Sequence, residues 1–219
     1  MSNTILKETQ SAQNSFFSIY KEKLEHLATN GQHPKALFIG CSDSRVTPER
    51  LLGLDPGDMF MLRNIANIIP PYVQTEIGIV SVLEYAVLSL QVPHIIVCGH
   101  TDCGGIRSLD QHIDMATVPA LSRWLDLARP AQRDIDFTLR DLTPEERHLA
   151  IVERNVINQL KNIESYPFIQ QSLAANKLTL HGWVYHLQPQ QITYYNSAQN
   201  HFISSTNLDF EPKNEKTTN

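Results

Sequence analysis

The sequence predicts an α/β fold: a mainly parallel central β-sheet flanked by helices. Three observations carry this prediction. Short apolar runs alternate along the chain with longer segments of helical periodicity, which is typical of parallel strands joined by helical crossovers. The length of 219 residues suits one large domain, here taken as 1–219. The composition, 42% apolar and 19% charged, is that of an ordinary globular protein.

The chain begins with a segment of roughly helical apolar spacing, from about Ile5 to Leu27, and Asn30-Gly31 suits its end. We expect residues 1–30 to form a long helical arm that packs on a neighbouring subunit rather than on its own sheet. Ala36–Gly40 is a short apolar run and predicts the first buried strand. Thr47-Pro48-Glu49 then predicts a helix start, with an N-cap, a proline at the first position and an acidic first turn.

Seven further elements are predicted by their apolar spacing. They are a strand at Met59–Leu62, a helix at Thr75–Leu90, a strand at His94–Cys98, helices at Pro119–Ala128 and Pro144–Ile163, and strands at Leu178–Leu187 and Gln191–Tyr195. Residues 211–219 are polar and are expected to form a frayed tail.

Charge and hydropathy exclude two classes of partner. Lys and Arg number 18 against 23 Asp and Glu, a net charge of −5 without a basic cluster, so neither nucleic acid nor an anionic membrane surface is expected to bind. The most apolar region, Tyr85–Thr101, is interrupted by Gln91, Pro93 and His94, and does not suit a membrane span. The first residues lack a basic start followed by an apolar run, so we expect a cytoplasmic protein.

The three cysteines are too few, and odd in number, for a disulfide framework. Each is a core residue, a metal ligand or a reactive thiol. Cys98 lies inside an apolar strand run and is expected in the core. Cys41 and Cys103 instead lie in polar turns that directly follow predicted strands.

Those two turns predict the site, because the carboxyl ends of neighbouring parallel strands meet at one edge of a sheet. The first turn offers Cys41, and the second offers His100 and Cys103 as His-x-x-Cys. Two thiolates and one imidazole suit zinc, whose catalytic sites use three protein ligands and leave the fourth position for water. The metal would lower the pKa of that water to about 7, which makes hydroxide available as a nucleophile.

Asp43 and Arg45 lie in the first turn at spacing i, i+2 and can form a bidentate ion pair. An ionised Asp43 beside the metal could accept a hydrogen bond from bound hydroxide and orient it. If the arginine contact broke, the same carboxylate could occupy the open metal position. The residues alone leave both roles of Asp43 open.

The two turns, Cys41-Ser-Asp-Ser-Arg45 and Gly99-His-Thr-Asp-Cys-Gly-Gly105, together resemble those of the β-class carbonic anhydrases. The resemblance extends over roughly residues 32–185, and the paired motif is highly specific. Further segments similar to the family are Pro56-Gly-Asp58, Arg63-Asn-Ile-Ala-Asn67, Glu84-Tyr-Ala86 and His181-Gly-Trp-Val-Tyr185.

The resemblance implies one zinc ion per subunit on Cys41, His100 and Cys103, with Asp43 and Arg45 as the catalytic dyad. It implies reversible hydration of carbon dioxide to bicarbonate and a proton, through attack by zinc-bound hydroxide. It further implies a dimer or higher homo-oligomer with active sites at the subunit interface.

Within the family the sequence is similar to the plant-like branch, which also has bacterial members. In that branch a glutamine, here Gln32, hydrogen-bonds substrate from the neighbouring subunit. The residues that resemble the lining of its narrow apolar pocket are Phe60, Ile65, Tyr85 and Gly104. An apolar pocket suits carbon dioxide, which is uncharged.

The sequence departs from the family at two places. The other bacterial branch has a tryptophan where this chain has Phe38, so its inhibitory bicarbonate site is not expected here, although Arg63 and Tyr185 remain. We therefore expect an open zinc site at neutral pH, with Asp43 paired to Arg45. The segment from His186 to Gln190 lacks the family's acidic residue and glycine turn.

Other functions compete with this interpretation. Hydrolysis of carbonyl sulfide or carbon disulfide uses the same scaffold and ligands. A structural zinc site in an interaction module would need a fourth ligand. A redox thiol protein would join Cys41 to Cys103 when free of metal. A zinc deaminase would need His-x-Glu and Cys-x-x-Cys, which the sequence lacks.

Overall fold

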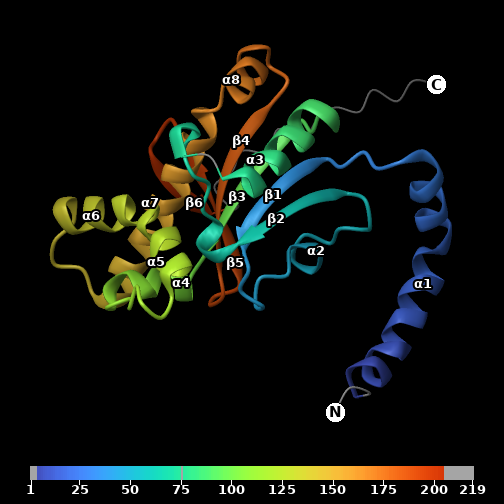
Figure 1. The fold of residues 1–219 in the computed structure, drawn as a ribbon, viewed down its shortest axis with the longest axis horizontal. Helices are drawn as coiled ribbons and strands as arrows, with labels where there is room; N and C mark the ends of the chain where they lie inside the picture. The colour runs from blue at the N-terminus through green and yellow to red at the C-terminus, as the bar shows by residue number, and fades with distance from the viewer. Residues whose placement is uncertain (1–3, 75, 205–219) are drawn as a thin grey trace.

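The structure is a computed structural model that describes residues 4–74 and 76–204. These residues form a six-stranded sheet of order β2-β1-β3-β4-β5-β6 with flanking helices (Figure 1). The first four strands in that order are parallel, and the last two continue the sheet antiparallel, so the predicted mainly parallel α/β sheet is confirmed. The strands are β1 (Ala36–Cys41), β2 (Met59–Asn64), β3 (His94–His100), β4 (Thr179–His186), β5 (Gln191–Asn196) and β6 (His201–Ser204).

Helix α1 forms the N-terminal arm, and the other helices lie in the connections between strands. The helices are α1 (Thr4–Asn30), α2 (Pro48–Leu51), α3 (Ile77–Glu84), α4 (Gly104–Arg107), α5 (Pro119–Asp126), α6 (Arg129–Thr138), α7 (Pro144–Glu164) and α8 (Pro167–Ala174). Short helical turns include η1 (Ile65–Asn67) and η3 (Tyr85–Ser89), the latter a π-helix that continues α3.

The two faces of the sheet are covered unequally. Alternate residues of a strand point to opposite faces, and Leu37 and Ile39 belong to the large core cluster that also contains buried residues of α3 to α8. Phe38 and Cys98 belong to a smaller cluster on the opposite face. Leu52, which directly follows α2, packs against this cluster. Cys98 is therefore a core residue, as the sequence predicts.

Helix α7 lies against β3 and β4 because two glycines make room for it. A Cβ atom at Gly99 would lie 2.8 Å from Cγ2 of Val156, and one at Gly182 would lie 3.0 Å from Cδ1 of Leu160. Any side chain at these positions would push the helix away from the sheet. This close packing places the polar residues of α7 beside the loop that follows β2.

The predicted N-terminal helix is present as α1, and Figure 1 shows it at the margin of the molecule, beyond α2. Its C-terminal half contacts the chain before β2: Lys23 Nζ lies 3.1 Å from Asp55 Oδ2 and 3.4 Å from Asp58 Oδ1. Phe17 and Ile19 remain 57% and 73% exposed. Packing of α1 on a neighbouring subunit stays a prediction.

Four elements, α4, α6, α8 and β6, were not predicted. Helix α6 is mostly polar and buries only Ala131 and Ile135, so its apolar stripe is too thin to detect by periodicity. Strand β6 is a four-residue edge strand in which His201 is exposed and the other three residues are only partly buried. At the predicted helix start, Thr47 takes the N-cap position of α2, but its side chain makes no capping hydrogen bond and the helix is only four residues long.

Some boundaries also differ from prediction. The helix expected over Thr75–Leu90 is α3 followed by the π-helix η3, and the helix expected to end at Ala128 ends at Asp126. The predicted polar tail, 211–219, lies outside the described residues. Within the described ranges, no helix combines the length and apolarity needed to cross a membrane.

Substituting Gly182 by Ala should lower stability, because the new methyl group meets Leu160, Val156 and the Cβ of Tyr195 at about 3 Å. Overpacking of this kind costs about 1–3 kcal/mol. The measurement is thermal unfolding followed by circular dichroism. Gly78→Ala is the matched control: a Cβ there meets no atom within 4 Å, and alanine favours the helix. Equal melting temperatures for the two variants would contradict close packing of α7.

Candidate active site

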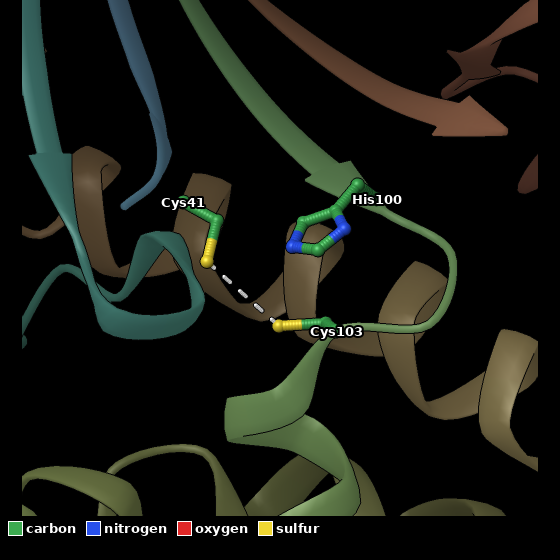
Figure 2. A group of neighbouring side chains, drawn as sticks. All are labelled: Cys41, His100 and Cys103. Atoms are coloured by element: carbon green, nitrogen blue, oxygen red, sulfur yellow. Dashed lines mark hydrogen bonds between the residues drawn. The ribbon is translucent and has the colours of Figure 1, made fainter. Parts of the chain in front are cut away.

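Two turns that follow neighbouring parallel strands meet at one edge of the sheet. Strand β1 ends at Cys41 and β3 ends at His100, and the strands pair directly with Gly40 opposite Cys98. After His100 the chain turns, and Cys103 takes the N-cap position of α4. The structure therefore brings Cys41, His100 and Cys103 together, with their side chains directed toward one another (Figure 2).

The three side chains are placed to hold one metal ion. Their sulfur and nitrogen atoms all lie within 4.8 Å of one another, and the two sulfur atoms are 3.9 Å apart. Two sulfurs bound to a tetrahedral zinc at ~2.3 Å lie about 3.8 Å apart. All three residues are buried, with at most 4% of their surface exposed. Ligand type and spacing therefore both fit zinc.

The imidazole of His100 is oriented as a metal ligand. Its Nδ1 lies 2.9 Å from the carbonyl oxygen of Thr101, and because a carbonyl only accepts, Nδ1 carries the proton. In the neutral ring Nε2 then has a free lone pair. Nε2 is buried and has no hydrogen-bond partner among the residues that the structure describes. A buried nitrogen without a partner is costly unless a ligand occupies it, and a metal ion would satisfy this atom.

The two thiols share a site that favours a thiolate at Cys41. The contact with Cys103 lowers the pKa of Cys41, and the nearby backbone N–H groups of Asp43 and Ala66 lower it further, against burial, which raises it. The same contact with Cys41, together with burial, raises the pKa of Cys103. Zinc would displace the proton from Cys103, because thiolates are the ligands that the metal binds.

Asp43 and Arg45 form the bidentate ion pair that their spacing predicts. Arg45 Nε donates to Asp43 Oδ1 at 2.9 Å, and Nη2 donates to Oδ2 at 2.8 Å. The hydrogen bonds from the Arg45 side chain hold the pKa of Asp43 well below its usual range, so the carboxylate stays ionised. Asp43 Oδ2 lies 3.9 Å from Nε2 of His100, so the pair stands beside the proposed metal position.

The ion pair is extended by two residues to which the sequence reasoning gave no role. Arg45 Nη1 donates to Asp102 Oδ2 at 2.7 Å, and Arg107 Nε donates to Asp102 Oδ1 at 2.6 Å. Asp102 lies in the His-Thr-Asp-Cys turn itself, at a left-handed φ of 57°. Its position between two zinc-ligand candidates was the available signal, but its partner Arg45 is 57 residues away.

Arg63 fixes the backbone of the first turn. Its Nε donates to the carbonyl oxygen of Cys41 at 2.9 Å, and its Nη2 donates to that of Asp43 at 2.8 Å. Both of these hydrogen bonds go to backbone atoms of the turn. These contacts hold the segment that carries both the first thiol and the carboxylate.

The predicted pocket residues lie on four elements: Phe60 in β2, Ile65 in η1, Tyr85 in η3 and Gly104 in α4. The rings of Phe60 and Tyr85 are 5.7 Å apart and tilted by 36°. Tyr85 is the first residue of η3, where the N–H of Leu90 bonds back to its carbonyl. Ile65 is partly exposed in η1, and Gly104 opens α4 with free space where a Cβ would lie.

Gln32 is placed differently. It is exposed in the segment between α1 and β1. That segment enters the amino end of β1, whereas Cys41 lies at the carboxyl end of the same strand. In its own chain Gln32 is therefore at the opposite edge of the sheet from the Cys–His–Cys group.

Comparison with known proteins agrees with this site. The family model described as carbonic anhydrase matches residues 36–192. A carbonic anhydrase of Pseudomonas aeruginosa is 40% identical over 81% of this chain and 80% of its own.

Solved structures give the same result. The β-carbonic anhydrase CcaA aligns with a TM-score of 0.84 and 33% identity, covering 91% of this chain and 90% of its own. One of the two tetrameric β-carbonic anhydrases of the ascomycete Sordaria macrospora aligns with a TM-score of 0.77 and 32% identity, over 87% and 96% of the two chains. The chain therefore belongs to the carbonic anhydrase family, as an enzyme of its β class.

Proposed function

We propose that the protein catalyses the zinc-dependent, reversible hydration of carbon dioxide to bicarbonate and a proton. The observation that carries the proposal is the buried Cys41–His100–Cys103 group, with the partnerless Nε2 of His100 beside the carboxylate of Asp43. Three ligands and a tethered carboxylate favour a catalytic site over a structural one with four protein ligands.

The proposed roles follow from the contacts of each residue. Cys41, His100 and Cys103 would hold the ion, which when bound lowers the pKa of a coordinated water and supplies hydroxide near neutral pH. Asp43 offers a hydrogen-bond acceptor next to the ligand set. Arg45 keeps that carboxylate ionised and turned toward the guanidinium rather than toward the metal.

The lining proposed for substrate is mainly apolar. Phe60, Ile65 and Tyr85 present ring and aliphatic surface, and Gly104 leaves open space at the start of α4. A linear, uncharged molecule has no charge for such a lining to pair, so exclusion of bulk water matters more than polar recognition.

The reducing cytoplasm is the proposed location, since all three cysteines are free.

We further propose a homo-oligomer in which each site is completed by a second copy. The relatives from Sordaria macrospora are tetrameric. Exposed apolar side chains on α1, such as Phe17 and Ile19, favour packing of this helix on a neighbouring subunit. The position of Gln32, far from the cysteines of its own chain, favours its action on substrate in the partner's site.

Replacing Asp43 by Asn should lower the rate of carbon dioxide hydration by about 10²-fold or more, because the neutral amide no longer accepts and orients as a carboxylate does. Stopped-flow assays at pH 7.5 and 8.5 on zinc-loaded protein measure this. The wild type should be active at both values, since the pKa of Asp43 lies below its usual range and the carboxylate is ionised throughout.

Asp136→Asn is the matched control, because Asp136 forms a similar bidentate pair with Arg147 at 2.7 and 3.0 Å, away from the metal ligands. It should leave the rate unchanged. Wild-type activity only at pH 8.5 would contradict the paired arrangement of Asp43. A zinc-loaded wild type that hydrolyses carbonyl sulfide but leaves carbon dioxide unchanged would contradict the proposed substrate.

Mixing two impaired variants tests whether Gln32 acts in the partner's site. Gln32→Ala and Asp43→Asn should each be slow alone. After dissociation and reassembly at equal amounts, half of the dimers are mixed, and each carries one intact site if Gln32 acts across the interface. Activity should then return to about a quarter of the wild-type value. If no activity returns although native mass spectrometry detects mixed dimers, Gln32 acts within its own chain or not at all.

A further inference from the structure

The guanidinium of Arg45 joins the two turns that carry the candidate metal ligands. Toward the first turn, Nε and Nη2 donate to the two carboxylate oxygens of Asp43, at 2.9 and 2.8 Å. Toward the second turn, Nη1 donates to Oδ2 of Asp102 at 2.7 Å, and Nη2 donates to the backbone carbonyl oxygen of Asp102 at 2.9 Å. All three guanidinium nitrogens are therefore engaged, and as many of these bonds go to Asp102 as to Asp43.

The backbone of Asp102 suits this double contact. Asp102 lies between His100 and Cys103 and has a left-handed φ of 57°. Its carbonyl oxygen and its carboxylate both accept from Arg45. Aspartate, asparagine and glycine adopt a left-handed φ more readily than other residues. The second turn thus presents a charged and a neutral acceptor to the same guanidinium.

Arg107, the last residue of α4, fixes the carboxylate of Asp102 from the other side. Its Nε donates to Oδ1 of Asp102 at 2.6 Å, while Oδ2 stays bonded to Arg45. The three side chains are about half exposed, and a single ion pair in such a position adds little to stability. A network of several charges with bidentate geometry is more effective. Asp102 is the residue through which this network reaches Arg45 from the second turn.

We infer that Asp102 is a positioning residue that keeps the metal site open: by holding Arg45, it keeps the carboxylate of Asp43 turned toward the guanidinium and away from the metal. Asp43 Oδ2 lies 3.9 Å from Nε2 of His100, so the carboxylate is close enough to the ligands to take the fourth position once Arg45 moves. Asp102 acts through Arg45, because its carboxylate accepts from the two arginines. The inference rests on the proposed function only in requiring that the Cys–His–Cys group binds a metal ion with a fourth position for a small ligand.

Loss of the Asp102 carboxylate should weaken the binding of a small anion to the metal. Such an anion binds only while Asp43 is absent from the fourth position, so its apparent Kd rises as the open fraction falls. Removal of a nearby negative charge by itself has the opposite effect, because repulsion of the anion decreases. The sign of the change in anion affinity therefore separates positioning from general electrostatics.

The test measures azide binding to the cobalt(II)-loaded protein at pH 7.5, followed by the change in visible absorption. Asp102→Gly removes the side chain and accepts the left-handed φ. Its Kd for azide should rise about tenfold or more, the factor that corresponds to loss of a charge-assisted hydrogen bond. Asp102→Asn retains a neutral acceptor and should raise the Kd less. It also covers the case in which the glycine variant does not fold.

Asp110→Asn is the matched control. Asp110 also bridges two side chains, accepting from Arg147 at 2.9 Å and from Gln132 at 2.8 Å, and its side chain is 46% exposed against 48% for Asp102. Its Kd for azide should stay within about twofold of the wild type. Cobalt content and circular dichroism confirm that each protein tested is loaded and folded.

A double variant shows whether the effect passes through Asp43. Asparagine is a poor metal ligand beside a carboxylate, so Asp43→Asn removes the group that would fill the fourth position. Combined with Asp102→Gly or Asp102→Asn, it should bind azide as tightly as Asp43→Asn alone, because the two changes then act on one step. Weaker binding by the double variant means that loss of Asp102 distorts the ligand turn, and it would overturn the inference.

Unchanged or tighter azide binding by the folded Asp102 variants would also overturn the inference, as would a cobalt-loaded wild type that binds no azide. None of these measurements involves carbon dioxide. A wild type that binds the metal and azide without hydrating carbon dioxide would therefore contradict the proposed function and leave this inference standing.

Discussion

The parallel pairing of β1 with β3 is the interaction on which the site depends. Its register sets Gly40 opposite Cys98, so that Cys41 and His100 leave the sheet at the same edge. The pairing alone places the two ligands, but it does not fix the loops around them. That task falls to α7, which approaches the sheet closely because Gly99 and Gly182 have no side chains.

Charge balance explains the polar groups around the sulfurs. Buried thiolates are unstable in a medium of low polarity unless positive charge or N–H donors face them. The metal would supply the charge, and the backbone N–H groups of Gly105 and Ile106, at the start of α4, face Cys103. Outside the ligands, Asp43, Arg45, Asp102 and Arg107 alternate in sign, so the carboxylate beside the metal stays ionised without leaving an unpaired charge.

Sequence reasoning reached the parts that are local or periodic. Apolar runs located the strands that form the parallel part of the sheet, and two polar turns located all three candidate ligands and the Asp43–Arg45 pair. It missed α6, whose apolar stripe is thin, and the role of Asp102, which depends on an arginine from another turn. The hydrogen bond from Asn155 Nδ2 on α7 to the carbonyl oxygen of Ala66 could not be predicted for the same reason. In the sequence Asn155 is a polar residue within an ordinary amphipathic helix, and its partner lies 89 residues away.

The amino acid at position 66, in the loop after β2, explains why a distant hydrogen-bond partner is needed. Ala66 has a left-handed φ of 61°. A glycine at position 66 would adopt the left-handed conformation without cost, but the chain has alanine there, and holding it costs about 1 kcal/mol or more. Buried hydrogen bonds contribute about 0.5–1.5 kcal/mol each, so one bond barely balances the strain at Ala66. The amides of α7 provide further hydrogen bonds to the loop, and the indole N–H of Trp124 donates another to the carbonyl oxygen of Ile65. The conformation of the loop after β2 is thus imposed by the packed helix and not by the loop's own sequence.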